Sequence, residues 1–245
     1  RKGKAPREVA ENKLVAGNVY EEVIQKLLPG GYSDAVREHN LHPIVLPKIE
    51  IVEAKEGNDW VVRAHTAQKP DVTLGDYKKA IREAKAAKQT TIWTPADAAK
   101  KPPTPDEEAK AKQMTLGELL EALLSVVTCT VPDILMENDV NRSLSDLIDQ
   151  TKKLGLTVDQ YLSSTGRTAE GIRKEYAQNA RRTLTLEFTL ETIADKESIF
   201  VSDDDLETAI KSAKTEEERA SLTKERYYLA SILRRQKTLD FLAAV

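Results

Sequence analysis

The sequence of 245 residues predicts an α+β protein, in which a small N-terminal helix and β-hairpin module precedes a larger all-α region with long helical arms. The spacing of apolar residues changes twice along the chain. It is helical before residue 40, has a period of two between residues 44 and 67, and is helical again from residue 114. Aromatic residues make up only 5% of the chain, so we expect the helices to pack through aliphatic side chains.

The N-terminal module, residues 1–76, begins with a helical pattern. Asn18 and Glu21 have the spacing of a capping box, which predicts that a helix begins at this point. Pro29-Gly30-Gly31 is expected to kink or break that helix, because proline lacks the backbone N–H that the preceding turn requires. The helical pattern then resumes over residues 32–39.

Two β-rich segments follow, residues 44–54 and 60–67. The short connection between them contains Gly57-Asn58, a pair that favours a tight turn, so the two segments predict an antiparallel hairpin. Pro47 cannot donate to a ladder of hydrogen bonds, which limits its strand to an edge or a bulge.

Residues 77–113 differ from both neighbours in composition. They are rich in Ala, Lys, Glu and Pro and contain few large apolar residues. This composition predicts a solvated helix followed by a linker that prolines interrupt, and it cannot supply the core of a packed domain.

Residues 114–245 have the apolar periodicity and capping residues of successive helices. Six helices are predicted. Four of them cover residues 116–127, 132–155, 168–195 and 215–243, and two shorter ones begin after the capping residues Thr157 and Ser202. The last helix is expected to turn one stripe inward, formed by Leu222, Leu229, Ile232, Leu233, Gln236 and Leu239.

The residues that most often carry chemistry do not form a recognisable active site. The three histidines, His39, His42 and His65, lack further ligands for a metal, and Cys129 has no neighbouring base or cation to activate it. The acidic run Asp203–Asp205 follows Ser202 and is explained by helix capping. No glycine-rich phosphate loop is present. The sequence therefore predicts neither an enzyme nor a cofactor.

The basic residues also predict little on their own. The net charge of −3 indicates that the whole molecule does not bind polyanions, so any basic site must be local. Arg181-Arg182 and Arg234-Arg235 fall in long amphipathic helices, where cations are usually solvated or paired with glutamate. A single cysteine excludes an internal disulfide, which suits a reducing cytosol.

Several segments together resemble the trigger factor family of ribosome-associated bacterial chaperones. "RKGKAP" at residues 1–6 is similar to the second part of the family's G-F-R-x-G-K-x-P signature. "KPDVTLGDYK" at residues 69–78 is similar to the exit of the ribosome-binding domain. The segments "CTVPDILMENDVNRSLSDLI", "LTVDQYLSSTG" and "IFVSDDDLETAI" follow the order of its C-terminal helical arms. The similarity covers nearly the whole chain except residues 79–113.

The resemblance implies a domain plan with one departure from the family. Residues 1–76 would form a partial ribosome-binding domain whose beginning is missing, and residues 114–245 a helical substrate-binding domain. Residues 77–113 would be a linker in place of the FKBP-like prolyl isomerase domain. Because this segment is too short for that domain, we expect no isomerase activity.

The resemblance also implies partners and site residues. The expected function is an ATP-independent chaperone that docks at the ribosomal exit tunnel and holds nascent or unfolded polypeptides. It would be cytoplasmic, with no membrane partner, no metal and no cofactor, and the family leaves a homodimer open. The residues expected to contact rRNA phosphates and an exit-tunnel protein are Arg1, Lys2, Gly3 and Lys4. Those expected to contact clients are Ile134, Leu135, Met136, Leu186 and Leu190.

Three alternatives belong to other classes. The chain could be a prolyl isomerase, as the family usually is, a SurA-like periplasmic chaperone, whose helical core resembles the arms, or a structural helical adaptor. A proline-peptide assay tests for the isomerase, and an encoded signal peptide would favour the periplasmic chaperone. Failure to bind unfolded clients would favour the structural adaptor.

Overall fold

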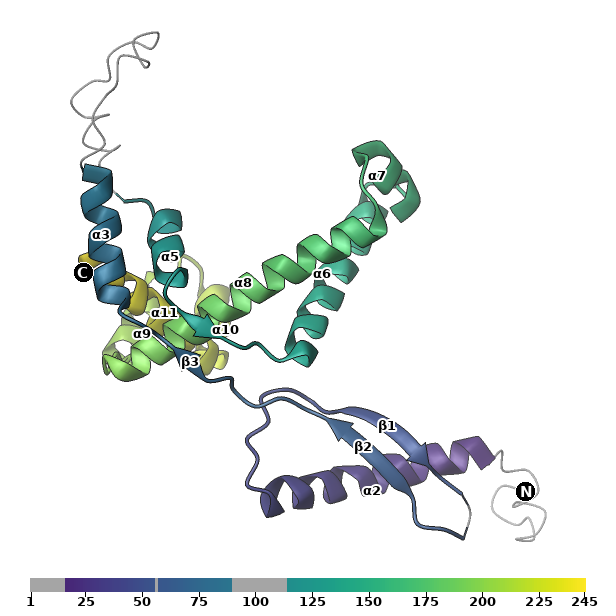
Figure 1. Cartoon of the computed structure of the whole chain (residues 1–245). Helices are drawn as coiled ribbons and strands as arrows, with labels where there is room; N and C mark the ends of the chain where they lie inside the picture. Colours follow the sequence, from purple (N-terminus) through teal and green to yellow (C-terminus); the bar gives the residue numbers. More distant parts are fainter. Residues whose placement is uncertain (1–15, 56, 90–113) are drawn as a thin grey trace. The chain divides into compact units, whose positions relative to one another are not determined.

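The computed structural model describes residues 16–55, 57–89 and 114–245 (Figure 1). The chain divides into two compact units, residues 1–69 and residues 70–245. The described elements are mostly helical with two small two-stranded sheets, which confirms the predicted α+β class. No helix in the described ranges is both long enough and apolar enough to span a membrane.

In the first unit, helix α2 (Ala16–Glu38) is continuous, contrary to the predicted break. The helix already includes Asn18, so the prediction that it begins there is wrong. Pro29 lies within it, and the Ser33 hydroxyl donates to the Pro29 carbonyl oxygen over 2.8 Å. The partly buried side chains on both sides of the proline continue one stripe, which favours continuity of the helix: Val23, Ile24, Leu28, Tyr32 and Val36.

The hairpin of the first unit forms as predicted. Strand β1 (Lys48–Glu53) pairs with β2 (Val61–His65) in antiparallel register, with an irregularity between Ile51 and Glu53. The turn contains Gly57 at a φ of 81°, a left-handed conformation that glycine adopts without steric cost. Pro47 lies immediately before β1 and so removes no ladder hydrogen bond.

The second unit contains a short antiparallel pair, β3 with β4, and a set of helices around it. Its elements are β3 (Val72–Thr73), α3 (Tyr77–Gln89), α5 (Leu116–Leu124), β4 (Thr128–Cys129), α6 (Asp133–Lys153), α7 (Val158–Thr165), α8 (Ala169–Lys196), α9 (Asp203–Ser212), α10 (Glu216–Lys224) and α11 (Arg226–Ala244). Helices α6 and α8 form a long arm that carries α7 at its end (Figure 1).

The core of the second unit joins helices that are distant in sequence. It consists of Leu74, Tyr77, Ile81, Leu119, Leu123, Leu190, Ile193 and Leu242. Helix α3 thus contributes Tyr77 and Ile81, which are 2% and 0% exposed, although its sequence indicated a solvated helix. Two large residues four positions apart are enough to bury one face of an alanine-rich helix. The segment expected to be a linker therefore begins with a packed helix, and residues 90–113 lie outside the described residues.

The predicted last helix is two helices, α10 and α11, separated at Glu225. The predicted inward stripe is correspondingly wrong in part, because Ile232 and Gln236 are exposed. Leu229, Thr238 and Leu242 are the buried side chains of α11. Glu225, between the two helices, has a φ of −100° and a ψ of 31°, and α11 packs against α8, α9 and α5.

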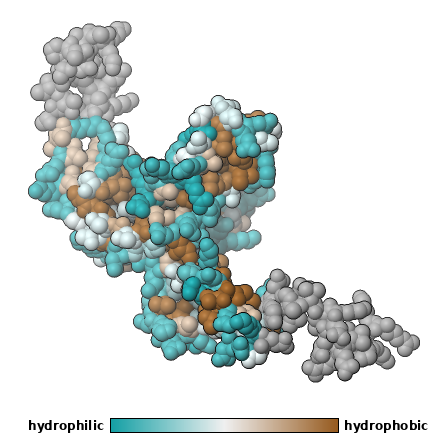
Figure 2. All heavy atoms as spheres, turned by 45° about the vertical axis from the view of Figure 1, so that its right-hand side comes forward, coloured by the Kyte–Doolittle hydropathy of each residue, from teal (hydrophilic) through white to brown (hydrophobic). Residues whose placement is uncertain are grey.

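Several large apolar side chains stay at the surface of the second unit, and Figure 2 shows such apolar areas between polar ones. Leu154 and Phe200 are each 71% exposed, and Tyr227 is 95% exposed. In the first unit Leu46 is 90% exposed. Each unit therefore presents apolar surface that its own core does not cover.

Candidate functional site

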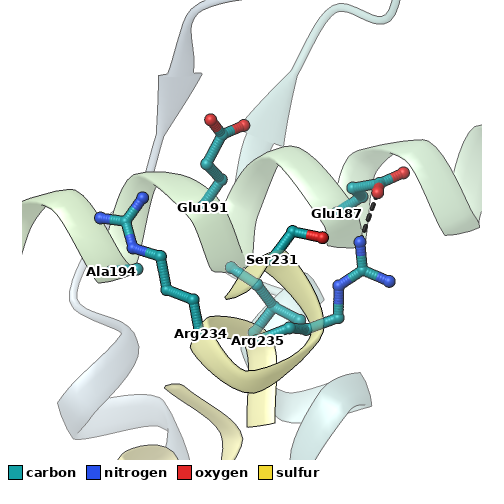
Figure 3. A pocket seen from close by; sticks show the side chains of 7 residues that line it. Glu187, Glu191, Ala194, Ser231, Arg234 and Arg235 are labelled. Atoms are coloured by element: carbon teal, nitrogen blue, oxygen red, sulfur yellow. Dashed lines mark hydrogen bonds and ion pairs between the residues drawn. The ribbon is translucent and has the colours of Figure 1, made fainter. Parts of the chain in front are cut away.

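Two hollows flank the long helix α8. The first lies between α8 and α11, has a volume of about 280 Å³, and is shown in Figure 3. Leu190 and Ala194 lie beneath it and are almost fully buried. Its remaining lining is polar and comes from Glu187, Glu191, Ser231, Arg234 and Arg235.

The two cations of this first pocket are engaged within the chain. The Arg234 guanidinium donates to Asp195 Oδ1 over 2.6 Å and to the Ile199 carbonyl oxygen over 2.9 Å. Arg235 forms an ion pair with Glu187 across the pocket (Figure 3). A ligand would have to break these contacts to use either charge, so the first pocket is better explained as structural packing between two helices.

The second hollow is a groove between α6 and α8, with a volume of about 520 Å³. This volume falls within the usual range of ligand pockets. Val140, at 4% exposure, lies at its base, and Met136 and Ala177 are partly buried beside it. We call these three residues the floor of the groove, and its rims are charged: Asp133 and Glu137 on α6, and Arg173, Lys174, Gln178 and Arg181 on α8.

The cations of this α6/α8 groove differ from those of the first pocket. Arg173, Lys174 and Arg181 are exposed, and none of them makes a hydrogen bond or an ion pair with another described residue. Next to them in sequence, Arg182 does pair, with Glu121 over 3.3 Å. The groove therefore combines an apolar floor with cations that are free to meet a ligand.

The residues expected to contact clients fall in different environments. Met136 lines the α6/α8 groove and Leu190 lines the first pocket. Leu135 is only 8% exposed, Leu186 packs against the core, and Ile134 is partly buried. Of the five, Met136 has the best access to a ligand in the groove.

The structure does not describe the residues expected to contact the ribosome, and it adds groove residues that the sequence analysis did not name. Arg1, Lys2, Gly3 and Lys4 lie outside the described residues. The groove cations Arg173 and Lys174 were missed by sequence reasoning. A cation–alanine–cation spacing of four, seen at Arg173, Ala177 and Arg181, was the available signal.

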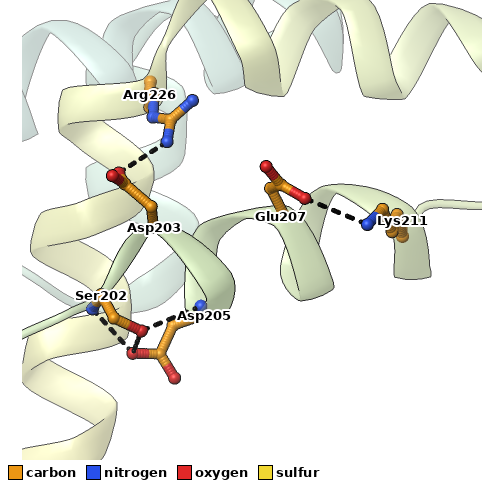
Figure 4. A network of polar contacts seen from close by, with 6 residues as sticks. All are labelled: Ser202, Asp203, Asp205, Glu207, Lys211 and Arg226. Atoms are coloured by element: carbon orange, nitrogen blue, oxygen red, sulfur yellow. Dashed lines mark hydrogen bonds and ion pairs between the residues drawn. The ribbon is translucent and has the colours of Figure 1, made fainter.

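The acidic run behind Ser202 is a helix cap, as predicted (Figure 4). The Ser202 backbone N–H donates to Asp205 Oδ2 over 2.8 Å, and the Asp205 backbone N–H donates to the Ser202 hydroxyl over 3.2 Å. Lys237 Nζ also donates to Asp205 Oδ2 over 2.5 Å. The lysine first, and then Ser202, hold the pKa of Asp205 at about 2. Asp203 forms an ion pair with Arg226, so both Asp203 and Asp205 make contacts within the folded chain.

The remaining titratable groups are explained by local contacts. Burial raises the pKa of the Cys129 thiol, which disfavours a nucleophilic thiolate. His65 Nε2 lies 3.4 Å from Glu50 Oε2, and no group of three or more potential metal ligands occurs within the described ranges. The Tyr77 hydroxyl donates to Glu197 Oε1 over 2.6 Å, which ties the start of α3 to the end of α8.

Two family models match this chain. The model described as "Bacterial trigger factor protein (TF)" matches residues 1–97, and the model described as "Bacterial trigger factor protein (TF) C-terminus" matches residues 104–244. The second of these covers more than half of the chain. Only residues 98–103 lie between the two matched regions.

Curated relatives of this chain are trigger factors. The trigger factor of Streptococcus suis strain 98HAH33 is 28% identical over 207 residues, which is 82% of this chain and 45% of the relative. That of Streptococcus pneumoniae strain Hungary19A-6 is 41% identical over 78 residues, 32% of this chain and 18% of the relative. The chain thus spans less than half the length of these relatives.

A solved structure, described as showing promiscuous substrate recognition in folding and assembly activities of the trigger factor chaperone, aligns with a TM-score of 0.58. The identity is 15%, and the alignment covers 100% of this chain and 88% of the solved chain. At this identity the likeness is one of fold.

Proposed function

Because the chain belongs to the trigger factor family, we propose that it is an ATP-independent molecular chaperone that docks at the ribosome and holds nascent or unfolded polypeptides. The observation that carries the proposal is the α6/α8 groove of the second unit, which combines an apolar floor with cations that make no hydrogen bond or ion pair with another described residue. An unfolded segment offers apolar side chains and charges at close spacing, which are the groups this groove can receive.

Release of the client is expected to need no nucleotide. The sequence has no glycine-rich phosphate loop, and the groove is open rather than closed over its floor. Weak contacts at a groove and at scattered exposed apolar side chains favour rapid exchange. A client that folds buries its apolar residues and so leaves these contacts.

The holding activity is tested by the aggregation of an unfolded client in the presence of the 245-residue chain. Met136→Ser removes an adaptable apolar contact from the groove and is expected to weaken the suppression of aggregation. Leu116→Ser is the matched control, because Leu116 is 54% exposed and lies outside the groove. Thermal unfolding of both variants establishes that they fold.

Two results would contradict this proposal. A chain that does not slow aggregation at all is no holdase. A Met136→Ser variant that folds and protects the client as well as the parent chain would remove the groove from the mechanism.

Ribosome docking is proposed through the basic segment at residues 1–4. Arg1, Lys2 and Lys4 would contact rRNA phosphates, and Gly3 would let the backbone approach closely. Such contacts release counterions, so three of them predict a loss of affinity of roughly 20- to 40-fold between 50 and 200 mM salt.

Salt-dependent co-sedimentation with ribosomes tests the docking. Replacement of the three basic residues at positions 1, 2 and 4 by alanine is expected to abolish the salt-sensitive binding. The control removes the same charge elsewhere, at Arg82, Lys152 and Lys153, which are exposed. Equal binding of the parent and both variants would refute the role of the basic segment.

We further propose a cytoplasmic location and no isomerase activity for this chain. The absence of isomerase activity is supported by the two matched family regions, which leave only residues 98–103 between them. A proline-peptide isomerisation assay is expected to give the uncatalysed rate, and acceleration above it would contradict the proposal.

A further inference from the structure

We propose that helix α2 carries a hinge at residues 29–33, where it opens transiently and lets its N-terminal segment, residues 16–28, bend away from residues 34–38. The helix is continuous in the structure, so the bent form is a minor state of the first unit. The hinge lies between the basic residues 1–4, which precede α2 in the sequence, and the hairpin, which follows it. The inference goes beyond the proposed holding and docking functions and does not depend on either of them.

The sequence of the hinge disfavours a helix at three consecutive positions. Pro29 has no backbone N–H, so the Gln25 carbonyl oxygen lacks the partner that it would have in a regular helix. Gly30 and Gly31 follow directly, and glycine is less favourable in a helix interior than any residue except proline. These three residues together make this the interior turn of α2 that opens at the lowest cost.

Packing does not explain the two glycines. Both are exposed, and a Cβ built at either position meets no neighbouring atom within 4 Å. Alanine would therefore fit at both positions and favour the helix. A glycine that a close neighbour required would show a contact, as Gly75 does with a carbonyl oxygen at 2.5 Å. The property that distinguishes Gly30 and Gly31 from alanine is therefore their low helix propensity.

Tertiary packing holds this helix only weakly. No side chain among residues 22–38 is fully buried, and the stripe that includes Leu28, Tyr32 and Val36 is only partly buried. Helices in proteins are stabilised mostly by the packing of such a face. Little packing therefore opposes a bend at the hinge.

Two side chains beside the glycines act in the same direction. The bond from the Ser33 hydroxyl to the Pro29 carbonyl oxygen joins positions i and i−4, a contact that often bends a helix. The Tyr32 hydroxyl oxygen is buried and has no hydrogen-bond partner among the described residues. Opening of the helix lets water reach this hydroxyl and so offsets part of the free energy of opening.

Amide hydrogen exchange of the 245-residue chain, resolved by residue with NMR, tests the hinge. The amides of residues 30–33 are expected to be less protected than those of Leu27 and Val36 on either side, because only their hydrogen bonds cross the hinge. Urea below the unfolding transition should hardly change exchange at residues 30–33, since a local bend exposes little surface. A helix that frays from its N-terminus would instead show protection that rises steadily along α2.

The variant G30A/G31A should slow exchange at the hinge roughly 20-fold, because two alanines favour the helix over two glycines. P29A should act in the same direction and serves as a second variant. The control G117A makes the same kind of change in α5 of the second unit, where the added Cβ meets no atom within 4 Å, and is expected to leave exchange at the hinge unchanged. Circular dichroism establishes that the variants fold.

Protection without a minimum at residues 30–33 would overturn the inference. Unchanged exchange at these residues in both G30A/G31A and P29A would overturn it as well. Ribosome co-sedimentation and aggregation assays on the same chains separate this result from a failure of the proposed function. A chain that shows the minimum but neither docks nor protects a client supports the hinge and refutes the proposed function.

Discussion

Replacing Ile81 by alanine is expected to destabilise the second unit strongly, although Ile81 lies in a segment whose composition indicates a solvated linker. The Ile81 side chain is 0% exposed and belongs to the same core cluster as Leu123 and Leu242. The substitution removes buried carbon atoms between helices α3, α5 and α11. If α3 is part of this core, the loss should resemble that of any central aliphatic residue.

The magnitude follows from the burial. Truncation of a fully buried isoleucine to alanine lowers the free energy of unfolding by about 2–5 kcal/mol. For a unit of this size, each kcal/mol shifts the melting temperature by roughly 2–4 °C, so we expect a decrease of roughly 4–20 °C. Thermal unfolding followed by far-ultraviolet circular dichroism measures it. Trp60 belongs to the first unit, so its fluorescence would not report this change.

The control is Arg82→Ala on the same helix. Arg82 is exposed and makes no hydrogen bond or ion pair with another described residue, so its loss is expected to change stability by less than about 0.5 kcal/mol. If Ile81→Ala and Arg82→Ala unfold at the same temperature as the parent chain, then α3 is not part of the core, and the reasoning fails.

Three further predictions concern the second unit. Gly75→Ala is expected to destabilise the second unit by roughly 1–3 kcal/mol in urea unfolding, because φ is 56° there and a Cβ would lie 2.5 Å from a carbonyl oxygen. Gly117→Ala in α5 is the control: its Cβ meets no atom within 4 Å, so this variant should be as stable as the parent chain or more stable. The pKa of Asp205 is lowered from 3.8 to about 2 in the folded chain, so its contribution to stability is complete above pH 3.8 and disappears as the pH falls toward 2. Asp205→Asn should flatten this part of a curve of stability against pH. An unchanged curve would contradict the role of the cap and of its lysine partner. Tyr77→Phe removes the hydroxyl that donates to the Glu197 carboxylate and should lower the free energy of unfolding by roughly 1.5–3 kcal/mol, which a variant as stable as the parent would refute.

The sequence alone determined the features whose physical cause lies within a few residues. Helix caps join residues three positions apart, so Thr157 and Ser202 could be assigned from the printed sequence, and the structure confirms both. The hairpin was equally predictable, because its turn fixes the pairing of the strands beside it. Of the kink or break predicted at Pro29, the break was wrong, since α2 and its stripe of partly buried apolar residues continue across the proline.

Only the tertiary structure decided which side chains are buried and which charges remain free. Arg235 is paired with Glu187, 48 positions away, and Arg182 with Glu121, 61 positions away, whereas Arg181 has no such partner among the residues that the structure describes. No local pattern distinguishes these arginines. The same holds for Ile81, which is buried by helices that follow it far along the chain. Burial and ion pairing depend on the distance between atoms in the folded chain, and for residues of different elements that distance is set by how the elements pack.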